Sequence, residues 1–488
     1  FGGISPVTKD YVNPEAPWPE IEKLSKLALH SNQSLVARAT LYPKYFTNLN
    51  EFSSPLIASK LLNITDAKSL IRSDNWKSGV SNHIPFYSKH VCNSDIQQII
   101  QEVESNPSIK NLQRLLESND KDFQYILDYA NNKKLEVFGK DISFVVNRNI
   151  NYTNICSFKC NFCAFSKGRG HDDLRGKPYN ISYDEIARRT QEAISRGATE
   201  VCLQGGIHPK FTGHTYIEIV KSIRSVSSSV HIHAFSPLEI DHGRKTLNIS
   251  AKEFLEELKN AGLNSLPGTA AEILHDDIRS KICPDKLTTS QWIEIIKTAH
   301  YVGLPSTSTM MFGHVENMSH VAHHLLKLNN LQLETNGITE FVPLPFVADE
   351  APIYRKGFAR PGPTFKESIL IHSVARILFN GKINNIQGSW VKMGLPGLKF
   401  LLSAGINDIG GVLMNESITR SAGAAFGQEL FLEDVLKITD ELDLNLVQRN
   451  TLYHSLPNRI KDLVEFQSIP LLPINNDYHQ PKKINNSL

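Results

Sequence analysis

The feature that most constrains the fold of this chain is an alternation of strand-like and helix-like segments that begins near residue 141. Short apolar runs, such as 199–206 and 305–313, alternate with stretches that have helical periodicity. Strands that alternate with helices at this spacing need crossover connections, which build a parallel sheet. We count roughly seven or eight such units over about 260 residues, the size of a (β/α) barrel. The sequence therefore predicts an α/β fold, with a TIM-like barrel at residues 136–435 and a helical N-terminal flank.

Several of the expected helices carry their own start and stop signals. A Ser or Thr followed three residues later by Glu or Gln forms a capping box, which satisfies backbone N–H groups at the helix start. A glycine after the last periodic residue ends a helix, because it adopts a left-handed backbone without strain. The boxes are Ser182 with Glu185, Ser250 with Glu253 and Thr288 with Gln291, and the terminating residues are Gly197 and Gly262.

The flanks of the barrel differ from it in composition. Residues 1–80 are rich in proline and turn residues, and a boundary is expected at 72–85, where Gly, Ser, Asn and Pro gather. A helical lead-in follows at 90–135. Residues 436–488 are expected to form a C-terminal helix and a polar tail that is disordered.

Composition and charge exclude several classes of protein. The 488 residues carry a formal net charge of +2 without a long basic block, so we expect no nucleic-acid partner. No apolar run is long enough to span a bilayer, so we expect no membrane partner. Six cysteines in a chain of this length are no disulfide framework, and their clustering indicates the cytoplasm or another reducing compartment. Because the chain begins with Phe1 rather than Met, we expect its true N-terminus to lie further upstream.

Three of the cysteines lie close together, with the spacing Cys156-x3-Cys160-x2-Cys163, directly after a predicted strand. Thiolates select zinc or iron–sulfur clusters. Structural zinc takes four ligands, and the fourth ligand here would have to be His171 or Cys202. His171 lies beyond the common spacing, and Cys202 falls inside a predicted strand. Three thiolates without an evident fourth ligand favour a [4Fe-4S] cluster that leaves one iron open.

Two other interpretations of these cysteines stay open. They can hold zinc in a binding module that has no catalytic activity, or they can be buried by coincidence in one loop. The remaining cysteines are scattered, and we interpret them as ordinary buried thiols: Cys92, Cys202 and Cys283.

The cysteine spacing, together with the aromatic Phe162 before the third cysteine, resembles the radical S-adenosylmethionine (SAM) superfamily. The resemblance implies that Cys156, Cys160 and Cys163 hold the cluster. It also implies that the open iron binds the amino and carboxyl groups of S-adenosyl-L-methionine. One electron from an external donor then yields a 5′-deoxyadenosyl radical. The motif does not identify the substrate.

Longer stretches resemble one family within that superfamily, the FO synthases, which make the deazaflavin chromophore. These stretches include NYTNICSFKCNFCAF, EVCLQGGIHP, HIHAFSPLEI, GLNSLPGTAAEIL, STSTMMFGHVE, NIQGSWVKMG and NDIGGVLMNESITR. Over residues 90–435 the resemblance is to the tyrosine-utilising (CofH-type) half. Residues 1–80 resemble the C-terminal tail of the other (CofG-type) half.

The resemblance implies a reaction between two small molecules. The 4-hydroxybenzyl part of L-tyrosine is joined to 5-amino-6-(D-ribitylamino)uracil, after the radical takes a hydrogen from tyrosine and the Cα–Cβ bond breaks. The CofG-type half then closes the ring, so we expect it as a partner in cis or in trans. The aminofutalosine synthase of menaquinone biosynthesis shares the cluster motif and is the alternative within the superfamily.

Residues near the ends of the predicted strands are candidates for contact with the cofactor, because barrel enzymes carry their chemistry there. Glycines let a backbone approach a ligand closely, although they also occur in plain turns. For Gly268, Thr269 and Glu272 we predict a helix start that suits an anion or a ribose hydroxyl, or else a capping box. His233 and Met311 have ordinary core positions as their alternative. The candidates are Phe162, Gln204, Gly205, Gly206, His233, Gly268, Thr269, Glu272 and Met311.

A second group of residues is expected near the substrate. The candidates are Ser236, Glu239, Asn415 and Glu416. The alternatives are a solvated loop carboxylate for Glu239 and an exposed pair of Glu416 with Arg420 at a helix start. Prolines between 343 and 363 predict a rigid loop that acts as a lid. The sequence assigns no catalytic acid or base.

Overall fold

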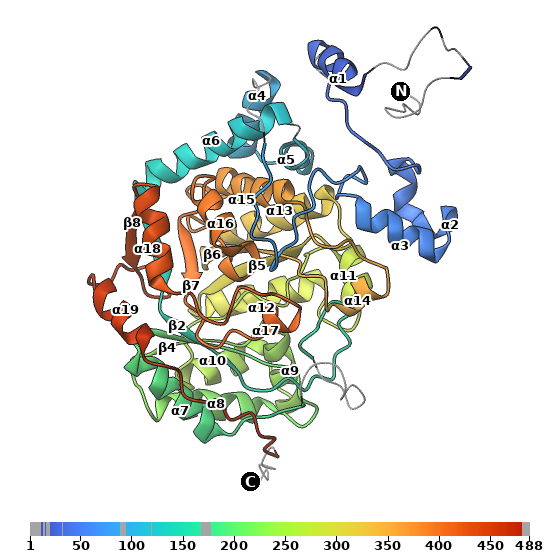
Figure 1. Ribbon diagram of the computed structural model, residues 1–488. Coiled ribbons are helices and arrows are strands. Elements are labelled where there is room, and N and C mark those ends of the chain that lie inside the picture. Colours follow the sequence, from blue (N-terminus) through green and yellow to red (C-terminus); the bar gives the residue numbers. More distant parts are fainter. Residues whose placement is uncertain are drawn as a thin grey trace.

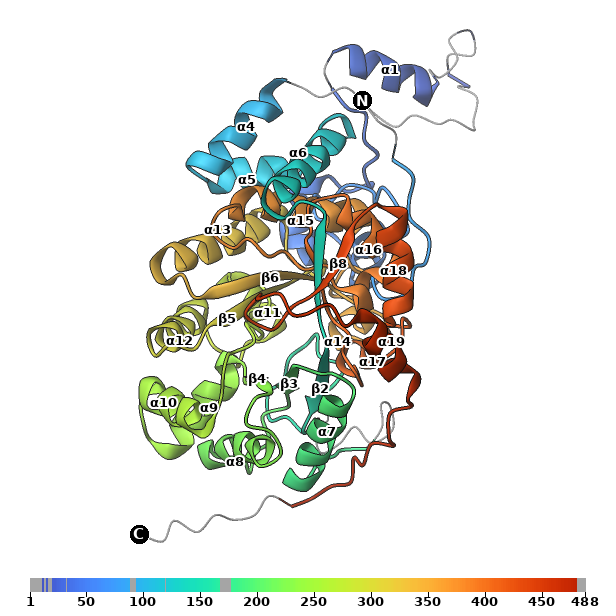
Figure 2. The ribbon, with the colours of Figure 1, turned by 90° about the vertical axis from the view of Figure 1, so that its left-hand side faces the viewer.

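The predicted barrel forms the centre of the computed structural model, which describes residues 11–12, 15, 20–31, 33–87, 94–118, 120–166 and 177–480. Figure 2 shows the strands at the centre of the molecule with helices around them. The strands are β1 (Asp141–Val145), β2 (Asn147–Asn151), β3 (Glu200–Gln204), β4 (His231–Ala234), β5 (Ser306–Phe312), β6 (Ile338–Pro345), β7 (Asp408–Gly411) and β8 (Asn445–Gln448).

Parallel pairing runs around the barrel and confirms the predicted topology. β2 pairs with β3 and β3 with β4, β5 pairs with β6, and β7 pairs with β1. Bridges at 265–266 join β4 to β5, and bridges at 386–387 join β6 to β7. At 265–266 and 386–387 the structure thus has isolated bridges in place of full strands. Because the strands are parallel, their carboxyl ends meet at one end of the barrel, where such enzymes carry their active sites.

Helices surround the barrel and build its flanks (Figure 1). Within the described residues, no helix combines the length and the apolar character that crossing a membrane requires. The flank before the barrel contains α1 (Ile21–His30), the 3-10 helix η1 (Pro43–Asn48), α2 (Leu49–Phe52), α3 (Pro55–Ile64), α4 (Ser94–Ser105), α5 (Ile109–Leu116) and α6 (Asp120–Phe138). The later helices are α7 (Tyr183–Ser195), α8 (Gly213–Arg224), α9 (Pro237–Leu247), α10 (Ala251–Ala261), α11 (Asp276–Ile282), α12 (Thr289–Tyr301), α13 (Met318–Thr335), α14 (Pro352–Arg355), α15 (Phe365–Phe379), α16 (Trp390–Leu402), α17 (Ile418–Ser421), α18 (Leu432–Glu441) and α19 (Ile460–Ser468).

Helix capping follows the sequence closely. The boxes at Ser250 and Thr288 form as predicted, and Gly262 ends α10 in a left-handed conformation with φ 118°. At α7 only half of the box forms. Ser182 accepts the N–H of Glu185, but the Glu185 carboxylate binds arginines of its own helix instead of closing the box.

Residues 65–82 lie against loops at the carboxyl end of the barrel. Hydrogen bonds join the N–H of Ala67 to Glu367 (2.7 Å), the Arg72 side chain to the carbonyl of Gly362 (2.8 Å) and the N–H of Gly79 to the carbonyl of Lys392 (2.6 Å). The region around 72–85, where we expected a boundary, is therefore packed against the barrel. The origin of residues 1–80 in a CofG-type half stays a prediction.

The amino end of the barrel is closed by the segment that follows β8. β8 pairs with β1 on the side opposite β7. The sequence did not predict β8. Arg449 donates to both carboxylate oxygens of Asp408 at 2.6 and 2.9 Å, and to Glu340 at 3.3 Å. The hydroxyl of Tyr453 also donates to Glu340. All of these side chains are largely buried, so each charge depends on its partner to offset the loss of water.

The sequence predicts a disordered C-terminal tail, yet residues 470–480, which we term the strap, find hydrogen-bond partners elsewhere in the chain. The strap lies along α7: Arg189 donates to the carbonyl of Asn475 at 2.8 Å, and Asn180 donates to the carbonyl of His479 at 2.7 Å. A composition rich in polar residues did not reveal that these backbone groups find partners on α7 and at Asn180. Residues 481–488 lie outside the described residues.

Replacement of Arg449 tests the closure of the barrel. Arg449→Met leaves Asp408 and Glu340 buried without their cation, so we expect the free energy of unfolding to fall by about 3–5 kcal/mol. The matched control is Arg459→Met, which removes an exposed partner of Asp462 and should cost less than about 1 kcal/mol. Urea denaturation followed by circular dichroism measures both. Equal stability of the two variants would contradict this account.

Candidate active site

The three clustered cysteines lie on a loop, residues 152–166, that begins at the carboxyl end of β2. We term it the cysteine loop. Backbone hydrogen bonds clamp it to three other segments: Ser157 N–H to Ile207 O (2.9 Å), Asn161 N–H to Ile282 O (2.8 Å) and Ile353 N–H to Asn161 O (2.7 Å). Ile353 belongs to α14, within the proline-rich loop predicted to be a lid. In this structure that loop packs directly on the cysteine loop.

The two glycines after β3 are required by close packing against the cysteine loop. A Cβ on Gly206 would lie 2.2 Å from the carbonyl oxygen of Ile155, and a Cβ on Gly205 would lie 2.3 Å from the ring of Tyr152. The N–H of Gly206 donates to the carbonyl of Thr153 at 2.9 Å. The close approach that these glycines permit is to the cysteine loop of the protein itself, and their contact with a cofactor stays a prediction.

The three thiols are suited to bind a metal centre. Burial raises the pKa of Cys160 and Cys163, so without a metal these thiols keep their protons, and iron would take the place of the protons. Backbone N–H groups of Ile207 and Ser166 point at the sulfurs of Cys156 and Cys163 at 3.3 and 3.4 Å. Within the described residues, no three Cys, His, Asp or Glu side chains converge closely enough to hold one ion. His171, one fourth ligand considered for zinc, lies outside those residues, as does Cys92.

A lysine stands beside the cysteine loop. The ammonium of Lys286 pairs with Glu272 at 2.9 Å and lies 5.1 Å from the centre of the Phe162 ring. Its positive charge lowers the pKa of Cys160 and so opposes the effect of burial. The sequence did not single out Lys286, because its role depends on which loops meet at the end of the barrel.

The predicted helix start at residues 268–272 is wrong. Ala270 and Glu272 have left-handed backbones, with φ 59° and 47°, and α11 begins only at Asp276. Glu272 therefore forms no capping box with Thr269 and binds Lys286 instead. A left-handed backbone at a non-glycine residue is strained, and such strain is concentrated at functional sites.

The neighbours of Glu272 are held by β5 and α12. A Cβ on Gly268 would lie 2.1 Å from the carbonyl oxygen of Thr307, so this glycine permits strand packing. The carbonyl of Thr269 accepts the indole N–H of Trp292 at 3.0 Å. The N–H of Met311 donates to the carbonyl of Glu272 at 2.9 Å, which places Met311 beside the Glu272–Lys286 pair.

His233 has partners inside the protein. Its ring nitrogen lies 2.7 Å from the hydroxyl of Ser265, and the charges that act on it belong to Glu200 and Arg449. Arg449 belongs to the segment that closes the amino end of the barrel. The surroundings of His233 match the alternative interpretation, a core histidine whose hydrogen bond is made within the protein.

Ser236 and Glu239 form the capping box of α9. Glu239 is buried rather than solvated, and it accepts a hydrogen bond from the hydroxyl of Tyr152. Burial raises the pKa of this carboxyl. Because the Tyr152 ring also packs on Gly205, the contact links α9 to the cysteine loop and to the glycine turn.

Asn415 and Glu416 are also bound by the protein. The side-chain oxygen of Asn415 accepts from Arg148 at 2.5 Å. Glu416 is buried and accepts the N–H of Thr419 at 2.7 Å and of Arg420 at 3.4 Å. Glu416 thus caps α17 through the backbone, and the exposed ion pair considered for Glu416 and Arg420 is absent from the described contacts.

A second lysine at this end of the barrel was also not predicted from the sequence. Lys392 lies in the first turn of α16, and the nearby charges of Glu416 and Glu272 act on it. Burial lowers its pKa to about 8, against the pull of these two carboxylates. Within the described residues its ammonium makes no hydrogen bond or ion pair.

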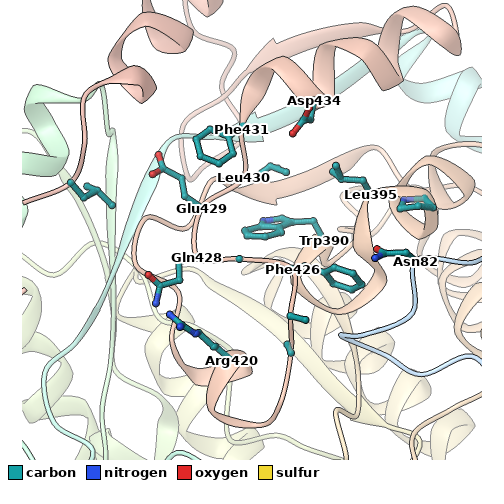
Figure 3. A pocket seen from close by; sticks show the side chains of 15 residues that line it. Asn82, Trp390, Leu395, Arg420, Phe426, Gln428, Glu429, Leu430, Phe431 and Asp434 are labelled. Atoms are coloured by element: carbon teal, nitrogen blue, oxygen red, sulfur yellow. The ribbon is translucent and has the colours of Figure 1, made fainter. Parts of the chain in front are cut away.

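A cavity of about 930 Å³ lies beside the first turn of α16 (Figure 3). Trp390 and Phe426 contribute aromatic walls, and Arg420, Glu429 and Asp434 contribute charges. None of the residues predicted to bind cofactor or substrate lines it. The cavity is therefore separate from the site built around the cysteine loop.

Two family models match the chain. They describe the Radical SAM superfamily, over residues 150–328, and the CofH/MqnC C-terminal region, over residues 335–454. Among solved structures, the maturase HydG from Carboxydothermus hydrogenoformans aligns with a TM-score of 0.55 at 14% identity, covering 74% of this chain and 80% of that one. Methylornithine synthase (PylB) aligns with a TM-score of 0.55 at 17% identity, covering 75% and 99%. These likenesses support the barrel fold.

Curated relatives are closer in sequence. The chain is 44% identical to the 5-amino-6-(D-ribitylamino)uracil–L-tyrosine 4-hydroxyphenyl transferase of Methanopyrus kandleri, across 67% of this chain and 88% of that protein. It is 36% identical to the FO synthases of Mycobacterium leprae and Nocardia farcinica, across 93% and 95% of this chain. It covers 58% and 60% of those two proteins, so it spans less than two thirds of their length.

A single methyl group tests the packing of the cysteine loop. Gly206→Ala forces the carbonyl of Ile155 away, so the loop shifts and most of the bound iron should be lost. The control is Gly397→Ala in α16, where the nearest atom to the new Cβ lies 3.1 Å away and iron content should be retained. Iron and sulfide analysis of anaerobically reconstituted protein measures both. Full iron content in the Gly206 variant would refute the clamp.

Proposed function

We propose that this chain, which belongs to the radical SAM family of FO synthases and tyrosine 4-hydroxyphenyl transferases, transfers the 4-hydroxybenzyl part of L-tyrosine to 5-amino-6-(D-ribitylamino)uracil. The carrying observation is the set of three thiols at the carboxyl end of a barrel, in a chain 44% identical to a protein with that named activity. The product leads to FO, the deazaflavin chromophore.

The chain's own residues would hold the cofactors and shield the reacting groups from water. Cys156, Cys160 and Cys163 would hold a [4Fe-4S] cluster, with S-adenosyl-L-methionine as the second cofactor. When bound, the two would supply radical chemistry, the abstraction of a hydrogen atom from tyrosine. The charge of Lys286 favours the thiolate forms of Cys160 and Cys163, because it opposes the larger rise in their pKa that burial causes. The surrounding barrel would exclude water and competing hydrogen donors from the reacting groups.

The alternatives have less support. An aminofutalosine synthase shares the cluster motif, but the named transferase aligns across most of its own length. A zinc-stabilised module needs a closed set of ligands, and no convergent set occurs within the described residues.

Partners and location extend the proposal. An external donor would reduce the cluster, and a CofG-type half, in cis or in trans, would complete the ring of FO. Such chemistry requires a reducing compartment, of which the cytoplasm is the most direct choice.

Two cysteine variants test the cluster. Cys160→Ala removes a ligand, so we expect loss of iron, of reductant-dependent SAM cleavage and of product. Cys283→Ala is the matched control, because this buried thiol lies outside the motif and its removal should leave iron and turnover in place. Product formation by the Cys160 variant would end the proposal. Loss of iron from the Cys283 variant would mean that a fourth protein thiol closes the cluster.

The substrate assignment needs its own assay. Anaerobic protein with SAM and dithionite should convert tyrosine and the ribitylated uracil to a coupled product. The same protein should leave an enolpyruvyl benzoate unchanged. Mass spectrometry of the products measures both arms. Turnover of the benzoate alone would favour the aminofutalosine synthase.

A further inference from the structure

Charged side chains alternate around the carboxyl end of the barrel. Lys286 stands beside Cys160, Glu272 pairs with Lys286, and Lys392 lies in the fields of Glu272 and Glu416. Glu272 comes from the segment after the 265–266 bridges, and Glu416 follows β7. These two segments are well separated in the strand order, and the charges of both carboxylates act on the Lys392 ammonium.

Three of these four charges are satisfied by the protein. Lys286 and Glu272 bind each other at 2.9 Å, and Glu416 accepts two backbone N–H groups of α17. Lys392 is the exception: its ammonium has neither a hydrogen bond nor an ion pair within the described residues, although the side chain is partly buried. A partly buried ammonium that has no protein partner within the described residues is stabilised when an anion binds to it.

The orientation of Lys392 follows from its helix. Trp390 lines the neighbouring cavity, and its indole N–H donates to the carbonyl of Gly411 at 3.0 Å. Two residues correspond to about 200° of rotation in an α-helix, so Lys392 leaves the first turn of α16 on the opposite side from that cavity. Figure 3 shows Trp390 among the residues that line the cavity.

We propose that the ammonium of Lys392 binds the α-carboxylate of the amino-acid substrate, which under the proposed function is L-tyrosine. A carboxylate matches a lysine as a single charge-assisted contact. The low pKa of Lys392, about 8, reflects burial without a paired anion and agrees with a cation that awaits one.

S-Adenosyl-L-methionine also carries an α-carboxylate, and the structure favours the other source. A cofactor held by the cluster would lie next to the cysteine loop, where Lys286 stands beside Phe162 and Cys160. The charges that act on Lys392 are carboxylates, and no cysteine is among them. Lys392 belongs to a different segment, the first turn of α16, so we assign it to the second amino acid of the proposed reaction, tyrosine.

The test is equilibrium binding to the cluster-loaded protein, measured by calorimetry. Lys392→Met should weaken L-tyrosine binding roughly 10- to 100-fold, and Lys392→Arg should restore most of it. The matched control is Lys399→Met on the same helix, whose lysine pairs with Glu441 and whose loss should leave tyrosine binding unchanged. Iron content verifies that each variant retains its cluster.

Ligand analogues give a second arm that needs no variant. Tyramine lacks the carboxylate, so wild-type protein should bind it roughly 10- to 100-fold more weakly than tyrosine. Lys392→Met should not change tyramine binding further. Equal affinity of the wild-type protein for tyramine and tyrosine would overturn the inference, even if the methionine variant failed to fold.

The remaining outcomes separate this inference from the proposed function. If wild-type protein makes the coupled product and Lys392→Met binds tyrosine normally, the inference alone fails. If Lys392→Met weakens SAM binding and leaves tyrosine binding intact, the carboxylate belongs to SAM and the assignment to the substrate is overturned. If wild-type protein neither binds tyrosine nor forms product, the proposed function fails and the inference with it.

Discussion

The buried ion cluster of Arg449 with Asp408 and Glu340 is the interaction on which the rest of the structure depends. It ties β6 and β7 to the segment after β8, and β1 is held between β7 and β8. β1 leads directly into β2 and then into the cysteine loop. Charges at one end of the barrel therefore set the position of thiols at the other end. Such a cluster gives little net stability. Removal of one partner is nevertheless strongly destabilising, because it leaves a buried charge unpaired.

The parts predicted correctly from the sequence are those with local signals. Helix caps such as Ser250 and Thr288 depend on neighbours three residues away, and the cysteine motif depends on spacing within one loop. β8 was not predicted, because its short run is no more apolar than a loop and becomes a strand only by pairing with β1. The strap was missed for the same reason, since its partners lie almost 300 residues earlier in the chain.

The error at Glu272 shows how a local rule fails at a functional site. Thr269 and Glu272 have the spacing of a capping box, and nothing nearby in the sequence contradicts that interpretation. In the structure Lys286 competes for the carboxylate, and the backbone adopts left-handed conformations that end any helix there. Where sequence rules and structure disagree in this way, a functional or strained site is the expected cause.

The kink in α16 bears on the orientation of Lys392, whose ammonium has no partner within the described residues. Gly394 has a non-helical backbone with φ 67°, and Pro396 follows it, so the first turn of the helix is set apart from the rest. Trp390 anchors that turn through its bond to Gly411. In a straight helix, packing of the whole helix against the barrel would set the orientation of the first turn. The separate turn instead lets the aromatic anchor orient Lys392, whose ammonium makes no hydrogen bond or ion pair within the part of the chain that the structure describes.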